Sequence, residues 1–156
     1  MTFLVSDSQH DRHAKISQFL NDREPVIAVL LAAADFEWTV RRAILALGSS
    51  SNVDIRLGVL ARCSGLGKYK EAWDKEVKKR FGKGLPEVVS NWEEFKTAFE
   101  LRHRLVHGVA GTTGVQFAER RVSTVLDASR EVADFGLSQS IDLFGRLPIR
   151  KRKKRQ

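Results

Sequence analysis

The stretch that decides the fold is residues 25–48, which read PVIAVLLAAADFEWTVRRAILALG. Pro25 suits the first turn of a helix, where its missing N–H group is not needed, and Gly48 suits the position just after a helix end. Between them, apolar side chains recur at spacings of three and four residues, which is the period of one helix face. These are Val29, Ala33, Phe36, Val40, Ala43 and Leu47. The stretch therefore predicts a long helix with one face in the core.

The rest of the chain has the same helical period, and no segment alternates as a strand does. Further helices are expected at about residues 8–21, 52–62, 68–81, 91–107 and 115–135, separated by breaks rich in Ser, Gly and Pro. Asn91 is expected to cap its helix, with Glu94 completing a capping box, and Gly108 to end it. The sequence predicts an all-α helical bundle of five or six helices in one domain, residues 1–145. A basic tail, residues 146–156, follows and is expected to be disordered.

In the helix expected at residues 52–62, the 3.6-residue period places Val53, Leu57 and Leu60 on the inner face. In the helix at residues 68–81 it places Trp73 and Val77 there. In the last helix it places five small apolar side chains inward. These five are Ala118, Val122, Val125, Val132 and Ala133.

The positive charge is concentrated at the C-terminus. The chain has 27 Lys and Arg against 19 Asp and Glu, a net charge of +8. Seven of the positive residues lie between Arg146 and Arg155 with no acidic residue among them, so the remaining chain is almost neutral. The high pI therefore does not by itself predict a basic surface on the fold. The tail either adds salt-sensitive affinity for RNA or serves only as a solubilising end. Its candidate RNA contacts are Lys151, Arg152, Lys153 and Lys154.

Composition argues against several classes of protein. Hydrophobic residues make up 42% of the chain, enough for an ordinary core. No apolar run approaches the roughly 20 residues needed to span a bilayer, so we expect no membrane partner. Residues 1–11 lack the pattern of a secretory signal. Cys63 is the only cysteine, which rules out an internal disulfide and favours a buried thiol in a reducing cytoplasm.

Two of the four histidines lie one helical turn apart. His103 and His107 are separated by four residues, so both project from one helix face, with Arg102 and Arg104 beside the first of them. An imidazole can accept or donate a proton, and a guanidinium can hold a phosphate through two hydrogen bonds. These groups suffice to cleave RNA by attack of its own 2′-hydroxyl, a reaction that needs neither a metal nor a cofactor.

Three other interpretations compete with this one. Histidines four residues apart could form half of a zinc site, but Arg104 stands where the zincin motif has glutamate, and arginines repel a dication. His107 could instead be a simple helix cap, because a cation is favoured at a helix C-terminus. A phosphate-binding P-loop at residues 65–68 is rejected, because Arg62 replaces its first glycine and Tyr69 its Ser or Thr.

The six residues from Arg102 to His107 resemble the signature of the HEPN superfamily, which is an arginine, a polar residue and a histidine written Arg-x(4–6)-His. Together with residues 91–95 and 36–45, they make the chain similar to stand-alone bacterial HEPN proteins linked to RNA cleavage, over roughly residues 25–135. The resemblance implies a homodimeric, metal-independent endoribonuclease whose composite active site takes one signature from each protomer. It implies that Arg102 binds the scissile phosphate, that His107 transfers the proton, and that His103 orients them or binds substrate.

The resemblance also directs attention to the long helix, where family members often place a polar or acidic residue near the site. Glu37 and Arg41, four residues apart, are therefore expected to support Arg102 or His107. The alternative is a surface ion pair of little energetic weight. Arg104 either contacts RNA or is solvated.

Other conspicuous side chains have ordinary explanations. His10 and His13 lie on a polar helix, where we expect them to be solvated rather than to bind a ligand. The tryptophans are expected in the core or in an interface rather than as platforms for stacked bases. These are Trp38, Trp73 and Trp92.

The expected protein is thus a cytoplasmic bacterial RNase whose partners are RNA and a second copy of itself. Its setting would be that of a toxin, an antiphage factor or a stress RNase, with an antitoxin or the product of a neighbouring gene as a further partner. The alternative within the family is a non-catalytic HEPN module that binds nucleotides or RNA, or only dimerises. A third class is a helical adaptor that binds a protein partner.

Overall fold

The computed structural model describes residues 7–108 and 113–154. These residues form helices joined by turns and contain no strand, which confirms the expected all-α class. None of the helices described is long and apolar enough to cross a membrane. The chain divides into two units, of which unit 1 comprises residues 1–38 and 91–130 and unit 2 comprises residues 39–90 and 131–156. The two longest helices, α2 (Pro25–Leu47) and α8 (Val115–Ser138), each contribute a segment to both units.

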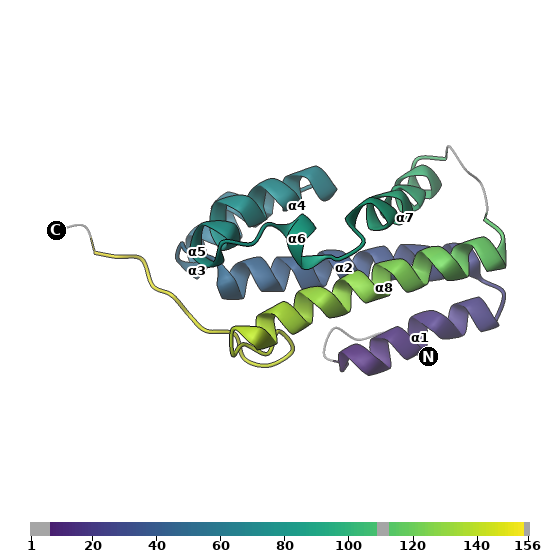
Figure 1. Ribbon diagram of the computed structural model, residues 1–156, viewed down its shortest axis with the longest axis horizontal. Coiled ribbons are helices and arrows are strands. Elements are labelled where there is room, and N and C mark those ends of the chain that lie inside the picture. The colour runs from purple at the N-terminus through teal and green to yellow at the C-terminus, as the bar shows by residue number, and fades with distance from the viewer. Residues whose placement is uncertain (1–6, 109–112, 155–156) are drawn as a thin grey trace. The chain divides into compact units, whose positions relative to one another are not determined.

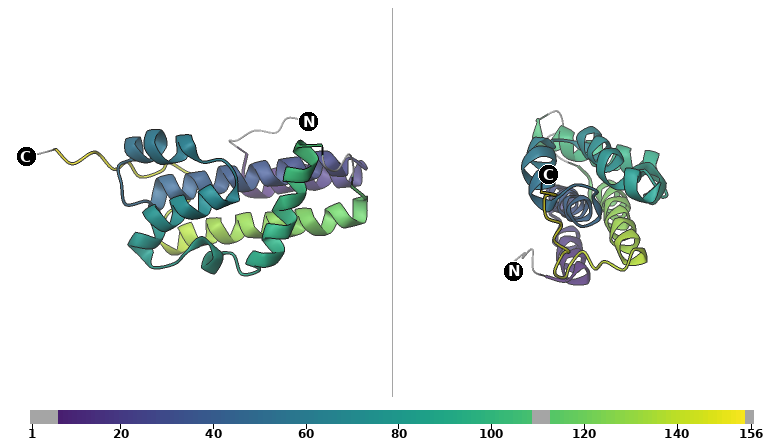
Figure 2. Two further views of the ribbon diagram at one scale, coloured as in Figure 1. Left: turned by 90° about the horizontal axis from the view of Figure 1, so that it is seen from above. Right: turned by 90° about the vertical axis from the view of Figure 1, so that its left-hand side faces the viewer.

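The long helix α2 has the predicted bounds, and its predicted inner face is buried throughout. It ends at Gly48, whose N–H donates to the carbonyl oxygen of Ile44 over 2.9 Å. A Cβ atom on Gly48 would lie only 2.4 Å from the Ile55 side chain and 2.6 Å from the Ile44 carbonyl oxygen, so close packing requires glycine here. In each unit a segment of α2 lies beside a segment of α8 (Figures 1 and 2).

Unit 1 is completed by α1 (Gln9–Asn21) and α7 (Trp92–Val106). Its core contains an aromatic cluster in which Phe36 of α2 meets Phe95 and Phe99 of α7, with ring centroids 4.4 Å and 5.9 Å away. Trp92 stacks on the same cluster, 5.4 Å from Phe95. Such rings bury much apolar area in tilted and edge-on arrangements, so they fix α7 against α2 within this unit.

The predicted capping box at the start of α7 is wrong. Asn91 stands at the N-cap position, but its side chain makes no capping hydrogen bond, and the Glu94 carboxylate is instead approached by the Thr124 hydroxyl at 3.5 Å. The reason is backbone geometry. Ser8, which does cap α1, has an extended ψ of 157°, whereas Asn91 has a ψ of 57°. An N-cap side chain reaches the first N–H groups of the helix only from the extended conformation.

Unit 2 is built from shorter helical pieces and the chain that follows α8. The pieces between α2 and α7 are α3 (Asn52–Asp54), η1 (Ile55–Val59), η2 (Leu60–Arg62), α4 (Leu66–Trp73), η3 (Asp74–Lys78), α5 (Lys79–Phe81) and α6 (Leu85–Val88). Trp73 and Val77 are fully buried, as predicted. The Trp73 ring lies 5.8 Å from that of Phe135 on α8, and its Nε1–H donates to the Lys83 carbonyl oxygen over 2.9 Å.

The segment at residues 52–62 is not the regular helix that was predicted. Ile55–Val59 form a π-helical turn and Leu60–Arg62 a 3₁₀ turn. The π turn changes the angular spacing of side chains, so a period of 3.6 residues assigns the wrong inner face. Val53 and Leu57 are accordingly 38% and 63% exposed, whereas Ile55 is fully buried. Of the predicted inner positions of residues 52–62, only Leu60 is buried.

In α8, all five predicted inner positions are buried.

Candidate functional site

The predicted catalytic residues lie at the C-terminal end of α7 in unit 1. Arg102 and His103 are in the last turns of this helix, and His107 is the residue that caps it. The His107 N–H donates to the His103 carbonyl oxygen over 3.0 Å, and Gly108 then turns the chain with a positive φ of 70°. A left-handed residue after a helix end is the usual role of glycine, and it closes α7 where the sequence predicted.

The imidazoles of His103 and His107 lie against each other at the helix surface. Their ring centroids are 4.3 Å apart and their planes are tilted by 51°. Both residues are exposed to solvent. The spacing of four residues therefore places the two rings on one face, as predicted, and presents their nitrogen atoms to a ligand approaching from outside.

Arg102 extends toward Glu37 of α2, which belongs to the same unit. The Arg102 Nη2 and Glu37 Oε1 atoms are 3.7 Å apart, an ion pair that is too long for a hydrogen bond. The Arg102 side chain is 33% exposed, and in the described parts of the chain its guanidinium has no hydrogen-bond acceptor. The Glu37 carboxylate thus gives the guanidinium a direction, and the N–H groups of Arg102 are left for a ligand.

The other half of the predicted supporting pair has different partners. In unit 2, the Arg41 guanidinium donates to the Tyr69 hydroxyl over 2.7 Å and to the carbonyl oxygens of Leu60 and Cys63 over 3.2 Å and 3.0 Å. Arg41 thus closes the end of η2 and stacks near the Tyr69 ring. The structure brings Glu37 to Arg102, but it commits the guanidinium of Arg41 to holding a turn.

The remaining predicted RNA contacts lie at or near the surface. Arg104 is half-buried, and its Nε–H is covered without an acceptor among the residues described. In unit 2, Lys151 to Lys154 are exposed, and Arg152 forms an ion pair with Asp54 at 2.7 Å. A buried N–H group without an acceptor is unfavourable, so this group lowers the stability of the end of α7.

The structure also contains a buried charged cluster that sequence analysis missed. Asp35 of α2 accepts hydrogen bonds from Arg12 Nε over 2.8 Å and from His13 Nε2 over 2.9 Å, both on α1. All three side chains are buried, so the prediction that His13 is solvated is wrong, whereas His10 is exposed as expected. The missed signal was Asp35 itself, because a carboxylate within an apolar helical run needs buried partners.

Burial alone would raise the pKa of Asp35. The hydrogen bonds from His13 and Arg12, together with their positive charges, outweigh this effect and lower the pKa below its usual value. Arg12 also lies over the Trp38 ring, 4.4 Å from its centroid. The cluster thus attaches α1 to α2 inside unit 1, and none of the predicted catalytic residues belongs to it.

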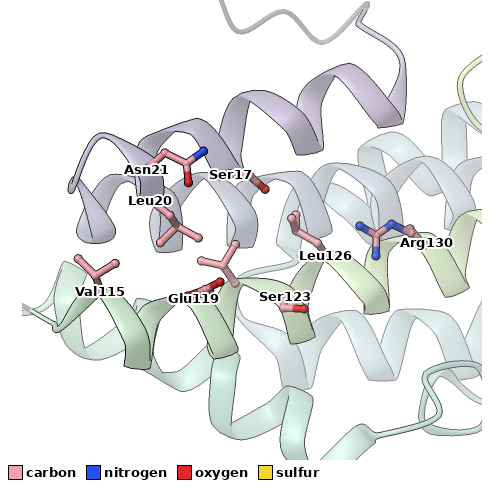
Figure 3. Close-up of a pocket in the computed structure, with 9 residues that line it drawn as sticks. Ser17, Leu20, Asn21, Val115, Glu119, Ser123, Leu126 and Arg130 are labelled. Carbon is pink, nitrogen blue, oxygen red and sulfur yellow. The ribbon is translucent and has the colours of Figure 1, made fainter.

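Unit 1 also contains a pocket of about 280 Å³ between α1 and α8 (Figure 3). Apolar side chains such as Leu20 and Leu126 line it together with polar ones such as Asn21, Ser123 and Arg130. The predicted catalytic residues are not part of its lining. Across residues 7–108 and 113–154, no cluster of three or more His, Cys, Asp or Glu could hold a metal ion.

Comparison of the chain with protein-family models, with curated proteins and with solved structures gave no match. The likeness to HEPN proteins consequently depends on the residues of the signature and on the helical order around it.

Proposed function

We propose that the protein is a metal-independent endoribonuclease of the HEPN type that acts as a homodimer. The observation that carries this proposal is the group of side chains in the last turns of α7, where two exposed imidazoles lie 4.3 Å apart and Arg102, next to His103 in sequence, has no hydrogen-bond acceptor among the described residues. Proton transfer and phosphate binding are the two tasks of metal-free RNA cleavage, and these groups perform them.

In the proposed reaction, a neutral imidazole removes the proton from a ribose 2′-hydroxyl. The 2′-oxygen then bonds to phosphorus, the bond from phosphorus to the 5′-oxygen breaks, and an imidazolium gives that oxygen a proton. The products are a 2′,3′-cyclic phosphate and a 5′-hydroxyl. Arg102 holds the phosphate oxygens while negative charge builds up on them, and His107 is a proton-transfer group.

The stacking of the two rings supports the dimer. In an in-line displacement the attacking and leaving oxygens lie on opposite sides of phosphorus, whereas His103 and His107 of one protomer lie on the same side of the site. One protomer therefore offers the base or the acid, and a two-fold axis supplies the other from the second copy. Val106, between the two histidines in sequence, is 51% exposed, and dimerisation would bury apolar area at this position.

Other residues have supporting roles in the proposal. Glu37 is a positioning residue, because it touches Arg102 and not the substrate. Arg104 is a further proposed RNA contact on α7, and the tail adds sequence-independent contacts through Lys151, Arg152, Lys153 and Lys154. The proposed setting is a bacterial cell in which the RNase acts as a toxin, an antiphage factor or a stress enzyme, together with an antitoxin or a neighbouring gene product.

The test uses end-labelled RNA in reactions with and without EDTA, and the variants Arg102→Ala and His107→Ala. Each should slow cleavage by about 10² to 10⁴, the usual contribution of one such group. His10→Ala and Arg120→Ala are matched controls on exposed helical positions of unit 1 and should cleave at the wild-type rate. A 2′-deoxy nucleotide at the cleavage position should block the reaction.

Three outcomes would overturn the proposal. Cleavage that survives in both variants would exclude this site, and cleavage that EDTA abolishes would exclude the mechanism. RNA binding without any cleavage would favour the non-catalytic module.

For Glu37→Gln, a fall in kcat with little change in KM is expected, because the residue positions Arg102 for the transition state.

A further inference from the structure

The near-neutral charge of the chain without its tail hides a separation of charge between the two units. Unit 1 has 9 Lys and Arg against 11 Asp and Glu, whereas unit 2 has 18 against 8. Without the seven positive residues of the tail, unit 2 still has 11 against 8. The excess of positive charge is thus a property of unit 2 as a folded body as well as of the tail.

The tail is attached to unit 2 at the C-terminal end of α2. The Arg150 guanidinium donates three hydrogen bonds of 2.7–2.9 Å to backbone carbonyl oxygens at this helix end. The acceptors are Leu45, Ala46 and Ser50. Carbonyl groups at a helix C-terminus lack partners within the helix and carry partial negative charge, so a guanidinium is well suited to them.

Asn52 holds the same part of the tail through its backbone and its side chain. Its backbone N–H donates to the Arg150 carbonyl oxygen over 3.1 Å, and its Oδ1 accepts from the Arg150 N–H over 2.6 Å. Its Nδ2 donates to the Pro148 carbonyl oxygen over 3.0 Å. Residues 148–150, which we call the strap, are therefore fixed to the turn after α2. The expected disorder of the tail stays a prediction for the residues that follow.

A basic helical segment meets the strap at the same helix end (Figure 1). Arg80 of α5 donates to the carbonyl oxygens of Leu47 and Gly48, both at 3.4 Å. The pKa of Arg150 is lowered, mainly by burial and secondly by the positive charge of Arg80. Glu76 accepts hydrogen bonds from the N–H and hydroxyl groups of Ser49 and Ser50, in the turn after α2. Carbonyl oxygens at one helix end thus hold both arginines.

Six lysines lie close in sequence to these two arginines, three on η3 and α5 just before Arg80 and three on the tail just after Arg150. Together we call them the lysine surface. They are Lys75, Lys78, Lys79, Lys151, Lys153 and Lys154. All six are exposed, and none has a carboxylate in ion-pair range among the residues described. Lys75, Lys78 and Lys79 fall within five consecutive residues, where the π-helical turn η3 runs into α5.

We infer that the lysine surface binds the phosphate backbone of RNA, and that Arg80, Arg150 and Asn52 hold it in place without touching the RNA. Flexible ammonium groups without carboxylate partners neutralise successive phosphates and release their counterions. A fixed strap strengthens this binding, because it fixes the point from which the three tail lysines extend before RNA arrives, and less conformational entropy is lost. That the polyanion is RNA rests on the proposed function. The location of the surface rests on unit 2 alone.

The first test measures binding of a fluorescent single-stranded RNA to the His107→Ala chain over a range of salt concentrations. The triple change Lys75→Gln, Lys78→Gln and Lys79→Gln should weaken binding at least about tenfold at 0.1 M salt. It should also reduce the slope of log K against log salt by about 2, at about 0.7 per phosphate contact of a single strand.

The matched control makes the same change of charge in unit 1, on exposed helical positions. It consists of Lys96→Gln, Arg120→Gln and Arg130→Gln. This control should weaken binding less than about threefold and leave the slope nearly unchanged. Equal losses for the two triple variants would mean that only total charge matters, and would overturn the inference.

The second test changes the strap without changing the charge. Asn52→Ala removes two of its hydrogen bonds, and Arg150→Lys keeps the positive charge but loses the three-carbonyl geometry. Each substitution should weaken RNA binding about threefold or more. An unchanged thermal unfolding midpoint in at least one of the two variants would confirm that the fold persists. Wild-type affinity in both variants would overturn the role of the strap.

The outcomes for this surface and for the nuclease are distinguishable. Salt-sensitive binding that depends on the lysine surface, in a wild-type chain that never cleaves RNA, would refute the nuclease and support the surface. Cleavage at the α7 site with RNA affinity unchanged by the lysine substitutions would support the nuclease and refute the role of the lysine surface. Binding to phosphatidylserine vesicles, with no binding to RNA, would refute the assignment of RNA as the partner.

Discussion

Asparagine in place of Asp35 tests the buried cluster that joins α1 to α2 in unit 1. The Asp35 carboxylate is fully buried, and the Arg12 side chain that donates to it is only 2% exposed. An asparagine has nearly the same shape, but it has one acceptor oxygen and an NH₂ group where the carboxylate has two acceptors. One of the donors on α1 would therefore face another donor, and the positive charge of Arg12 would lose the negative charge opposite it.

The expected loss is about 3 kcal/mol in the free energy of unfolding. Breaking a buried ion pair by removing one partner costs about 3–5 kcal/mol, because the other charge stays buried. We expect the low end of this range, because Arg12 also donates to the Asp7 carbonyl oxygen and lies over the Trp38 ring. Against a total stability of about 5–15 kcal/mol, this is a large fraction.

The assay is urea unfolding followed by circular dichroism at pH 7. The matched control is Asp127→Asn on α8 of the same unit, where the carboxylate is 60% exposed and pairs with Arg130. This exposed pair should contribute less than about 1 kcal/mol. If Asp35→Asn and Asp127→Asn destabilise the protein equally, the buried cluster does not have the energetic role argued for it.

The pH dependence gives a second check with a defined sign. The pKa of Asp35 is lower in the folded protein than in the unfolded chain, where it is about 3.9. Stability from this carboxylate is therefore fully present above the unfolded-state pKa, and it is lost as the pH falls through the folded-state pKa. The difference between wild type and Asp35→Asn should be constant at neutral pH and shrink below about pH 4.

Three further predictions each concern the surroundings of a single residue. Glu76→Gln should lower the free energy of unfolding in urea at pH 7 by about 2 kcal/mol, because the hydrogen bonds that Ser49 and Ser50 donate to a charged carboxylate are lost. Burial raises the pKa of Glu76, but those hydrogen bonds outweigh burial and lower it, so this loss of stability should vanish in acid. Burial raises the pKa of the Cys63 thiol, so labelling by a thiol reagent at pH 7 should be slower than in urea, and equal rates would contradict this. Gly108→Ala should lower stability by about 1 kcal/mol because its φ is 70°, and an unchanged thermal midpoint would refute that.

Local rules were sufficient wherever a single helix decided the outcome. Proline at the start, glycine at the end and a regular apolar stripe fixed the bounds and the inner face of α2 from the sequence. The stacking of His103 on His107 is likewise a consequence of helical spacing alone. In these cases the interacting groups lie within one turn of each other, so tertiary structure adds nothing that the period does not contain.

Local rules failed where backbone conformation or a distant partner decided the outcome. Whether Asn91 caps α7 depends on its ψ angle, and the inner face of residues 52–62 depends on a π turn that has no clear sequence signal. His13 is buried because of Asp35, which lies 22 residues away on another helix. The carbonyl acceptors of Arg150 lie about 100 residues before it in the chain.

The arginines show why a count of charges in the sequence misleads. In unit 2, the guanidiniums of Arg41, Arg80 and Arg150 donate to backbone carbonyl oxygens at helix ends and turns. Each guanidinium is held by these carbonyl oxygens, so its charge serves the fold and is less available to a polyanion. Arg102 differs, because it has only a long ion pair with Glu37 and no internal acceptor in the described chain. A guanidinium that the fold does not use is the one that a phosphate can engage.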